Sequence, residues 1–313
     1  MTFDWLLDAT VAAALPLVAW TVARSVALSR AIVLFIAFGL LSALAWTRLG
    51  AIDVALVEAS VGAGLSGALV MSALSWANLD EATVARRSVI ARAFVAAAIA
   101  LCLGAVLLGV PDPSEGLLGD VSANLGDAGV HQPITAVLMS YRGYDTLFEL
   151  VVLISAALTI GAAKSARLEA RPGSDLLRAL ADALLPLCIV LSAYFLWRGS
   201  NAPGGAFQGG AVLAGGVLVS TLAERLRRPR LTVWWIRAAL VLGPASFLLV
   251  GMPRFVEGAP FLEYGPQSAS RAIFAIELGS LVTIALVLAS FFPGVGPLET
   301  APDASSERTR GHR

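Results

Sequence analysis

Residues 198–210, RGSNAPGGAFQGG, separate two long apolar runs and contain five glycines, a proline and an asparagine. Proline lacks a backbone donor and disfavours helical geometry in the residue before it. The apolar helix before this stretch is therefore predicted to end near Gly199, and the next helix to begin near Phe207. Irregular backbone beside a bilayer is tolerated only where protein or water satisfies its polar groups.

The composition places these runs in a membrane. Of 313 residues, 58% are hydrophobic and 14% are charged, with a mean hydropathy of +0.80. Soluble domains are less apolar and more highly charged. The chain is thus predicted to be an all-α, polytopic membrane protein. Its 22 basic residues balance its 22 acidic residues, so no nucleic-acid partner is expected.

Nine transmembrane helices are predicted from apolar runs of roughly the length that spans a bilayer. They cover residues 5–22, 31–45, 53–76, 90–110, 144–163, 179–197, 207–223, 234–251 and 272–292. With nine spans, most of the basic residues fall on one side, whereas an even number would scramble them. The positive-inside rule then places the N-terminus outside and the C-terminus in the cytoplasm.

The loops predict two modules, at residues 1–165 and 178–292, followed by a disordered cytoplasmic tail at 293–313. The loop 164–178 between the modules is charged and contains a Pro-Gly break. Residues 111–143 form one long external segment, with a helix expected near Ile134–Ser140. No segment is long and polar enough for a soluble nucleotide-binding or iron–sulfur domain. Cys102 and Cys188 lie far apart within apolar runs, so they are expected in the core rather than at a metal site.

Ionisable side chains at membrane depth are candidate functional groups, because each costs at least about 2.5–3.5 kcal/mol to insert. Glu58 lies one turn into the third span. Asp53, at the start of the same span, is interpreted as a helix cap. Glu277 lies in the ninth span with no basic residue within one turn, so it lies either on an ion pathway or at a subunit interface. Asp182, near the start of the sixth span, is interpreted as an acid at the membrane surface.

Asp145 and Glu149 are four residues apart at the start of the fifth span. This spacing places both carboxylates on one helical face, about 5–6 Å apart. At low dielectric they cannot both ionise cheaply, so the pair is predicted to share a proton. In the alternative, Asp145 caps the helix and is screened by Arg142, while Glu149 pairs with a neighbouring chain.

Two interpretations of the glycine-rich turn are open. Gly204 and Gly205 permit backbone geometry closed to other residues, and the following helix would direct its positive N-terminus at an ion- or water-lined site. Alternatively, small residues four apart, as at Gly205 and Gly209 or Gly210 and Ala214, allow close helix packing. Both can hold at once.

Three segments resemble one family. GSNAPGGAFQGG at 199–210 resembles the GHNxPGGGFxGG signature of the B subunit of Mrp/Mnh-type multisubunit sodium/proton antiporters. IDVALVEASVGAGLS at 52–66 is similar to PDxALTEAxVGAGL, and YRGYDTLFELVVL at 141–153 to FRxFDTLGExVVL, both from the C-terminal extension of the large A subunit. Related modules are separate small subunits in membrane-bound hydrogenases. The resemblance covers roughly residues 5–292.

The resemblance implies specific site residues. The family's important acids in these segments fall on Glu58, Asp145 and Glu149, and Glu277 joins them from its position alone. The matched positions of the turn are Gly199, Asn201, Pro203, Gly204, Gly205, Phe207, Gly209 and Gly210.

This chain departs from the family pattern at four positions. Ser200 replaces a histidine, which removes a group that titrates near neutral pH. Ala206 replaces a glycine, and Val57 replaces a threonine. Phe148 replaces a glycine, which makes the surroundings of its neighbours bulkier and drier.

The resemblance implies an accessory component of a multisubunit Na+/H+ antiporter in a prokaryotic inner membrane, and a transporter subunit rather than an enzyme. Its expected partners are other membrane subunits, including large proton-channel subunits, with Na+, H+ and the lipid bilayer. No cofactor or metal is expected. The only lysine is Lys164, in a loop, which argues against a self-contained pump that relies on intramembrane lysines. Two alternatives are the membrane arm of a redox complex and a non-conducting structural subunit.

Overall fold

The computed structural model describes residues 4–25, 27–70, 86–109, 117–162, 175–226, 233–265 and 267–292. Within these ranges all regular secondary structure is helical, which confirms the predicted all-α class. The predicted tail at 293–313 and most of the loop 164–178 lie outside the described residues.

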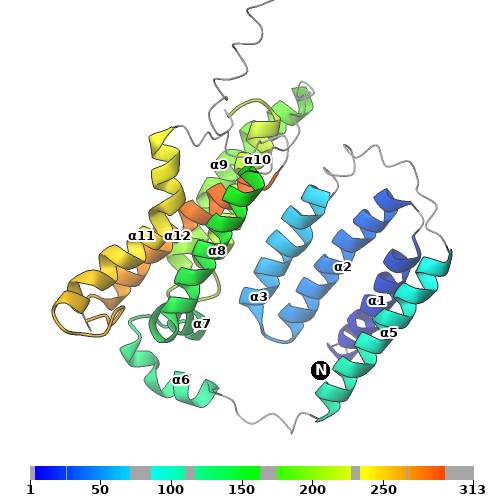
Figure 1. Cartoon of the computed structure of the whole chain (residues 1–313), viewed down its shortest axis with the longest axis horizontal. Coiled ribbons are helices and arrows are strands. Elements are labelled where there is room, and N and C mark those ends of the chain that lie inside the picture. The colour runs from blue at the N-terminus through cyan, green and yellow to red at the C-terminus, as the bar shows by residue number, and fades with distance from the viewer. Residues whose placement is uncertain are drawn as a thin grey trace, which may run out of the picture.

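The long helices match the nine predicted spans (Figure 1). They are α1 Asp4–Arg24, α2 Leu28–Arg48, α3 Ile52–Val57 continued by the π-helix η1 Glu58–Leu65, α5 Arg86–Gly109, α8 Gly143–Ala162, α9 Asp175–Arg198, α10 Ala206–Leu222, α11 Trp234–Val256 and α12 Ala269–Ser290. Seven described helices are long and apolar enough to cross a membrane, the third of them extending to Val70. Two further apolar helices, at Ala93–Gly109 and Ala206–Leu222, are shorter.

Short helices fill the described part of the segment at residues 111–143. They are α6 Leu118–Asn124, the 3-10 helix η2 Leu125–Asp127, α7 Pro133–Ala136 and the π-helix η3 Val137–Tyr141. The predicted helix near Ile134–Ser140 is thus confirmed. Proline fits at the first position of α7 because a backbone N–H at this position would have no partner within the helix.

The helices form two neighbouring groups in Figure 1. In the first, α2 packs against α1, α3 and η1. In the second, α10 lies between α9 and α12, while α11 and α8 also pack on α12. Contacts of α3 and η1 with α10 join the groups. Segments from both groups of helices therefore meet at α10.

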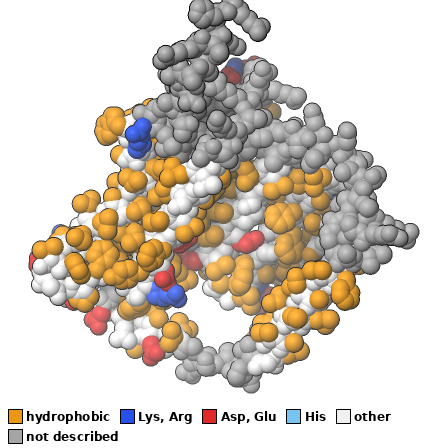
Figure 2. Space-filling view, in the orientation of Figure 1, with side chains coloured by type: hydrophobic (Ala, Val, Ile, Leu, Met, Phe, Trp, Pro, Cys, Tyr) orange, Lys and Arg blue, Asp and Glu red, His pale blue; other side chains and the backbone are white. Residues whose placement is uncertain are grey.

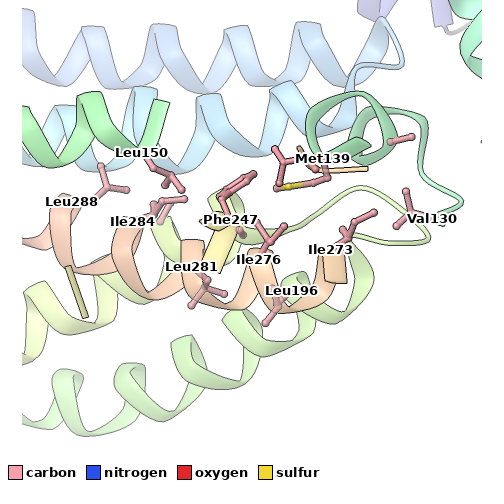
Figure 3. Packing of buried hydrophobic residues seen from close by; sticks show 14 of the residues in the cluster. Val130, Met139, Leu150, Leu196, Phe247, Ile273, Ile276, Leu281, Ile284 and Leu288 are labelled. Atoms are coloured by element: carbon pink, nitrogen blue, oxygen red, sulfur yellow. The ribbon is translucent and has the colours of Figure 1, made fainter. Parts of the chain in front are cut away.

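The core is centred on α12, of whose spanning segment 67% is buried. Ile273, Ile276 and Ile284 on α12 pack with Leu150 of α8 and Phe247 of α11 (Figure 3). Lipid tails are as apolar as these side chains, so close packing rather than water exclusion holds such helices together.

Small residues bring α10 close to its neighbours. A Cβ added at Gly210 would lie 2.8 Å from Cγ2 of Ile284, and one at Gly209 would lie 2.8 Å from Cδ1 of Leu281. One at Gly216 would lie 2.8 Å from Cβ of Cys188 on α9. The close-packing interpretation of the glycines is therefore confirmed at Gly209 and Gly210.

Much of the outer surface is apolar, as Figure 2 shows for one face. On α5, Phe94, Leu101 and Leu108 are 76%, 75% and 91% exposed. Cys102 lies on the same helix and is also exposed, so its predicted core position is wrong. Apolar residues lie on every side of α5. The pattern of hydrophobicity alone therefore does not show which side of this helix faces the core. Such surfaces suit lipid or other membrane subunits.

Candidate functional site

The glycine-rich turn interrupts the helical structure where the sequence predicts. Helix α9 ends at Arg198 and α10 begins at Ala206. Gly204 and Gly205 have backbone φ angles of +150° and +119°, which residues other than glycine rarely adopt. The N–H groups of Gly199 and Gly205 both donate to the Phe195 carbonyl, at 3.0 and 2.8 Å. The turn therefore folds back over the end of α9.

Residues at and just before the start of α7 form hydrogen bonds with this turn. The N–H groups of His131 and Gln132 donate to the Ser200 carbonyl, at 2.8 and 3.1 Å. The hydroxyl of Thr135 donates to the Gly199 carbonyl at 2.6 Å. Ser200 contributes its backbone oxygen, which any residue could supply, so the serine does not disturb this anchoring. Asn201 is exposed and Pro203 is partly exposed.

Glu277 of α12 lies against the N-terminus of α10. Its side chain is 2% exposed, and its carboxylate accepts a hydrogen bond from the Ala206 backbone N–H. A Cβ at Gly205 would lie 2.8 Å from Oε1 of Glu277, so glycine is needed for this approach. The free N–H groups and positive dipole end of a helix favour a carboxylate there. Because Glu277 is buried within its own chain, the subunit-interface alternative is wrong.

Asp53 is a site residue that sequence reasoning missed. Its side chain is 6% exposed and accepts hydrogen bonds from Gln132 Nε2 at 2.8 Å and from the Gly204 N–H at 2.9 Å. Gln208 Nε2 lies 3.5 Å from Oδ1 of Asp53. These bonds run to other segments, so the interpretation of Asp53 as a cap of its own helix is wrong.

A cavity of about 370 Å³ lies among α3, α7, η3, α8, α10 and α12. Three carboxylates line it, those of Asp53, Glu149 and Glu277, together with the polar side chains of Gln208 and Ser280. Most of the remaining lining residues are apolar, and none of the described residues that line it is Lys, Arg or His. Figure 2 shows acidic side chains near the middle of a largely hydrophobic face. The lining is therefore rich in acids and lacks basic groups.

The structure brings Glu149 and Glu277 to this cavity, along with Gly204, Gly205 and Phe207 of the turn. Glu149 is exposed, so it lies at the open side of the cavity. The two acids come from α8 and α12, which pack against each other.

Asp145 and Glu58 are not among the residues that line the cavity. The side chain of Asp145 is 53% exposed and forms an ion pair with Arg142 at 2.5 Å, as in the alternative that Arg142 screens it. Glu58 is half-buried where α3 passes into η1, and its Oε1 lies 2.7 Å from where a Gly62 Cβ would be. Asp182 pairs with Arg225 at the exposed surface, as predicted.

Two π-helices adjoin the cavity. The first, η1, follows directly after Val57, which lines it, and η3 contributes Leu138 and Met139 to its wall. π-helical turns are rare and occur frequently at functional sites.

Two family models match this chain. Residues 176–294 match a domain related to the MnhB subunit of Na+/H+ antiporter, and residues 13–78 match the model for the D subunit of MBH. The first match contains Glu277 and Gln208, and the second contains Asp53, and all three residues line the cavity.

Curated relatives agree with these matches. A protein of Rhizobium meliloti (strain 1021), the A/B subunit of a probable K(+)/H(+) antiporter, is 26% identical over 218 residues, covering 52% of this chain and 21% of that protein. The B subunit of the Na(+)/H(+) antiporter of Bacillus subtilis (strain 168) is 34% identical over 94 residues, covering 29% of this chain and 65% of that protein. The match to the first relative thus spans about a fifth of its length, and the match to the second about two thirds.

The fold is also similar to a solved structure. The chain superposes on a chain of the Mrp complex from Dietzia sp. DQ12-45-1b with a TM-score of 0.75 and 26% sequence identity. The match covers 94% of this chain and 35% of that one. The predicted resemblance to Mrp-type antiporter subunits is confirmed by these comparisons together.

Proposed function

Since the chain combines a domain related to the MnhB subunit of Na+/H+ antiporters with a domain that matches the D subunit of MBH, we propose that it is an accessory component of a multisubunit monovalent cation/proton antiporter. Its partners are other membrane subunits, including large proton-channel subunits, and its transported ions are Na+ or a similar cation and H+. It lies in a prokaryotic inner membrane as two modules, residues 1–165 and 178–292, with its N-terminus outside.

The cavity is the observation that carries this proposal. It lies between the two matched segments and is lined by three carboxylates without a basic residue among its described lining. Acids at membrane depth are costly and persist where they handle protons or cations. A binding module that only joined subunits would not need three acids around an open volume whose described lining has no basic residue.

The path runs from the exposed Glu149 to the buried Glu277. We place Asp145, one turn before Glu149 on α8, at the outer end of this path, where it forms an ion pair with Arg142. Glu58 continues the path along η1, one residue beyond the cavity-lining Val57. Protons or cations pass between these groups by way of water.

Charge-neutral substitutions test the proposal. Glu149→Gln and Glu277→Gln would be made in the complete complex, and cation-driven proton movement measured with a pH-sensitive dye in everted vesicles. We expect each substitution to reduce transport at least about tenfold, because an amide neither takes up nor releases a proton as an acid or base at neutral pH.

The matched control is Glu257→Gln, which removes an exposed carboxylate paired with Arg254 outside the helices. It should leave transport unchanged. Normal transport in both cavity variants, with the complex assembled, would instead support a non-conducting structural subunit.

The match to the D subunit of MBH favours one second candidate, the membrane arm of a redox-driven complex. Purification of the tagged chain from its native host, followed by mass spectrometry of the bound proteins, separates the two. Large antiporter-like subunits without redox proteins support the antiporter, whereas stoichiometric nickel–iron or iron–sulfur subunits support the redox complex.

A further inference from the structure

Two buried oxygen atoms on α12 have no hydrogen-bond partner among the described residues: Oε2 of Glu277 and Oγ of Ser280. Glu277 and Ser280 are 2% and 1% exposed, and both line the cavity. They are three residues apart, so they lie on the same face of the helix. Buried polar atoms are almost always satisfied, and two unsatisfied ones facing the same volume indicate that something binds there.

The charges around the cavity indicate a cation. Asp53 already receives hydrogen bonds from Gln132 and Gly204, with Gln208 also in reach. Glu277 receives one, from Ala206, on one side of its carboxylate. Its other oxygen is a buried acceptor without a partner among the described residues. A solute that carries positive charge would complete it.

Oxygen atoms are the ligands that the unpartnered side chains offer. Besides Glu277 and Ser280, the side chain of Gln208 lies with Nε2 toward Asp53 and with Oε1 3.8 Å from where a Gly205 Cβ would be. Oxygen donors suit hard cations. One uncompensated carboxylate with neutral oxygens matches a single positive charge better than two.

We propose that Glu277 Oε2 and Ser280 Oγ bind a partly dehydrated monovalent alkali cation, with Gln208 and water completing its shell. This site deepens the proposed function, on which it rests, since it locates the transported cation at the inner end of the path. The Gly204–Gly205 turn shapes the site, because any side chain at Gly205 would displace the Glu277 carboxylate.

The test measures cation binding apart from transport. The complete complex, purified in choline chloride, would be titrated with NaCl or KCl while carboxylate bands are followed by infrared difference spectroscopy and the melting temperature is recorded. We expect saturable changes in the wild-type complex, and a higher melting temperature as the cation binds the folded state.

Two variants assign the site. Glu277→Gln should abolish the saturable carboxylate signal, and Ser280→Ala should weaken the apparent affinity about tenfold, the effect of losing one ligand to a charged group. The matched control is Ser220→Ala, because Ser220 Oγ on α10 is equally buried and also unpartnered but is not among the residues lining the cavity. It should bind as the wild type does.

The outcomes distinguish this site from the function on which it rests. If the wild-type complex shows no saturable signal, or Glu277→Gln and Ser280→Ala both bind normally, the site is refuted. Transport that still depends on Glu277 would then assign it to protons alone and leave the proposed function intact. Cation binding that needs Glu277 and Ser280, in a complex whose transport ignores both, would uphold the site and overturn the function. Should Glu277→Gln fail to assemble, Ser280→Ala against Ser220→Ala decides the matter.

Discussion

The Asp53 carboxylate accepts a hydrogen bond from the backbone N–H of Gly204 at 2.9 Å, across 151 residues of sequence. The same carboxylate accepts from Gln132, which lies on the segment that anchors Ser200. One acid at the start of α3 therefore joins the segment before α7 and the break between α9 and α10. The geometry around Glu277 depends on a residue from the other group of helices.

Asp53→Ala should destabilise this junction. It leaves the half-buried donors of Gln132 and Gly204 without their acceptor, and an unsatisfied donor costs about 1–3 kcal/mol. We expect a loss of roughly 2–4 kcal/mol, measured as a lower melting temperature of the purified complex. The control Asp182→Ala removes an exposed ion pair and should cost at most about 1 kcal/mol. Equal effects of the two substitutions would show that the Asp53 bonds are unimportant.

Gly205→Ala should impair the site by two effects that can be separated. The alanine would sit at a φ of +119° and its Cβ would lie 2.8 Å from Oε1 of Glu277. At Gly258, φ is +91° but no atom of the described residues lies within 4 Å of an added Cβ. Gly258→Ala thus reports backbone strain alone, about 1–2 kcal/mol.

We expect Gly205→Ala to lower the melting temperature further than Gly258→Ala does, and only Gly205→Ala to reduce transport. If both variants transport normally, the close approach of Glu277 to the turn has no role in ion movement.

Glu149→Ala should abolish transport while the complex assembles. Glu149 is exposed at the cavity, so its removal leaves no buried partner unsatisfied and costs little stability. Asp145→Asn should have a smaller effect, because Asp145 pairs with Arg142 outside the cavity. Vesicle transport and native gel electrophoresis measure the two properties. Thr159→Ala, an exposed change later on α8, is the control.

A larger loss of transport in Asp145→Asn than in Glu149→Ala would reverse this order. It would favour the predicted proton-sharing pair over a path that begins at Glu149.

Tyr264→Phe should destabilise the loop before α12 by about 1 kcal/mol. The Tyr264 hydroxyl donates to the Met139 carbonyl at 2.9 Å, and burial raises the pKa of this phenol above its ordinary value. A raised pKa gives stability that is complete below the unfolded-state pKa of about 10 and is lost only as pH rises through the folded-state pKa. The difference in melting temperature between wild type and variant should therefore be the same at pH 6 and pH 9. A difference that shrinks by pH 9 would show that the hydroxyl ionises earlier.

The helices and their breaks could be predicted because their signals are local. Runs of apolar residues mark the spans, and Pro203 with its flanking glycines marks the break after Arg198. Glu277 could be singled out for the same reason, as an acid alone within an apolar helix.

The partners of these residues could not be predicted locally. Asp53 bonds to residues 79 and 151 positions away, and its place in a first turn suggested a cap. In the sequence, Gln208 and Ser280 do not stand out from other polar residues. Only the packing of α10 and α12 places both of them at the cavity. The sequence did offer one signal for Asp53 and one for Gln208: Asp53 is an acid and Gln208 an amide within an apolar segment, and each lies in a stretch that resembles a family motif. The wrong position for Cys102 has a related cause, since an apolar helix in lipid is apolar on every side.

The heavily buried α12 has a consequence for how the protein is made. It is the last described helix to leave the ribosome, yet α8, α10 and α11 all pack on it. Until it inserts, the faces of α8, α10 and α11 that pack on α12 lack their partner. Pairs such as α1 with α2 and α9 with α10 can form before it, and we expect the cavity to close only once α12 is in place.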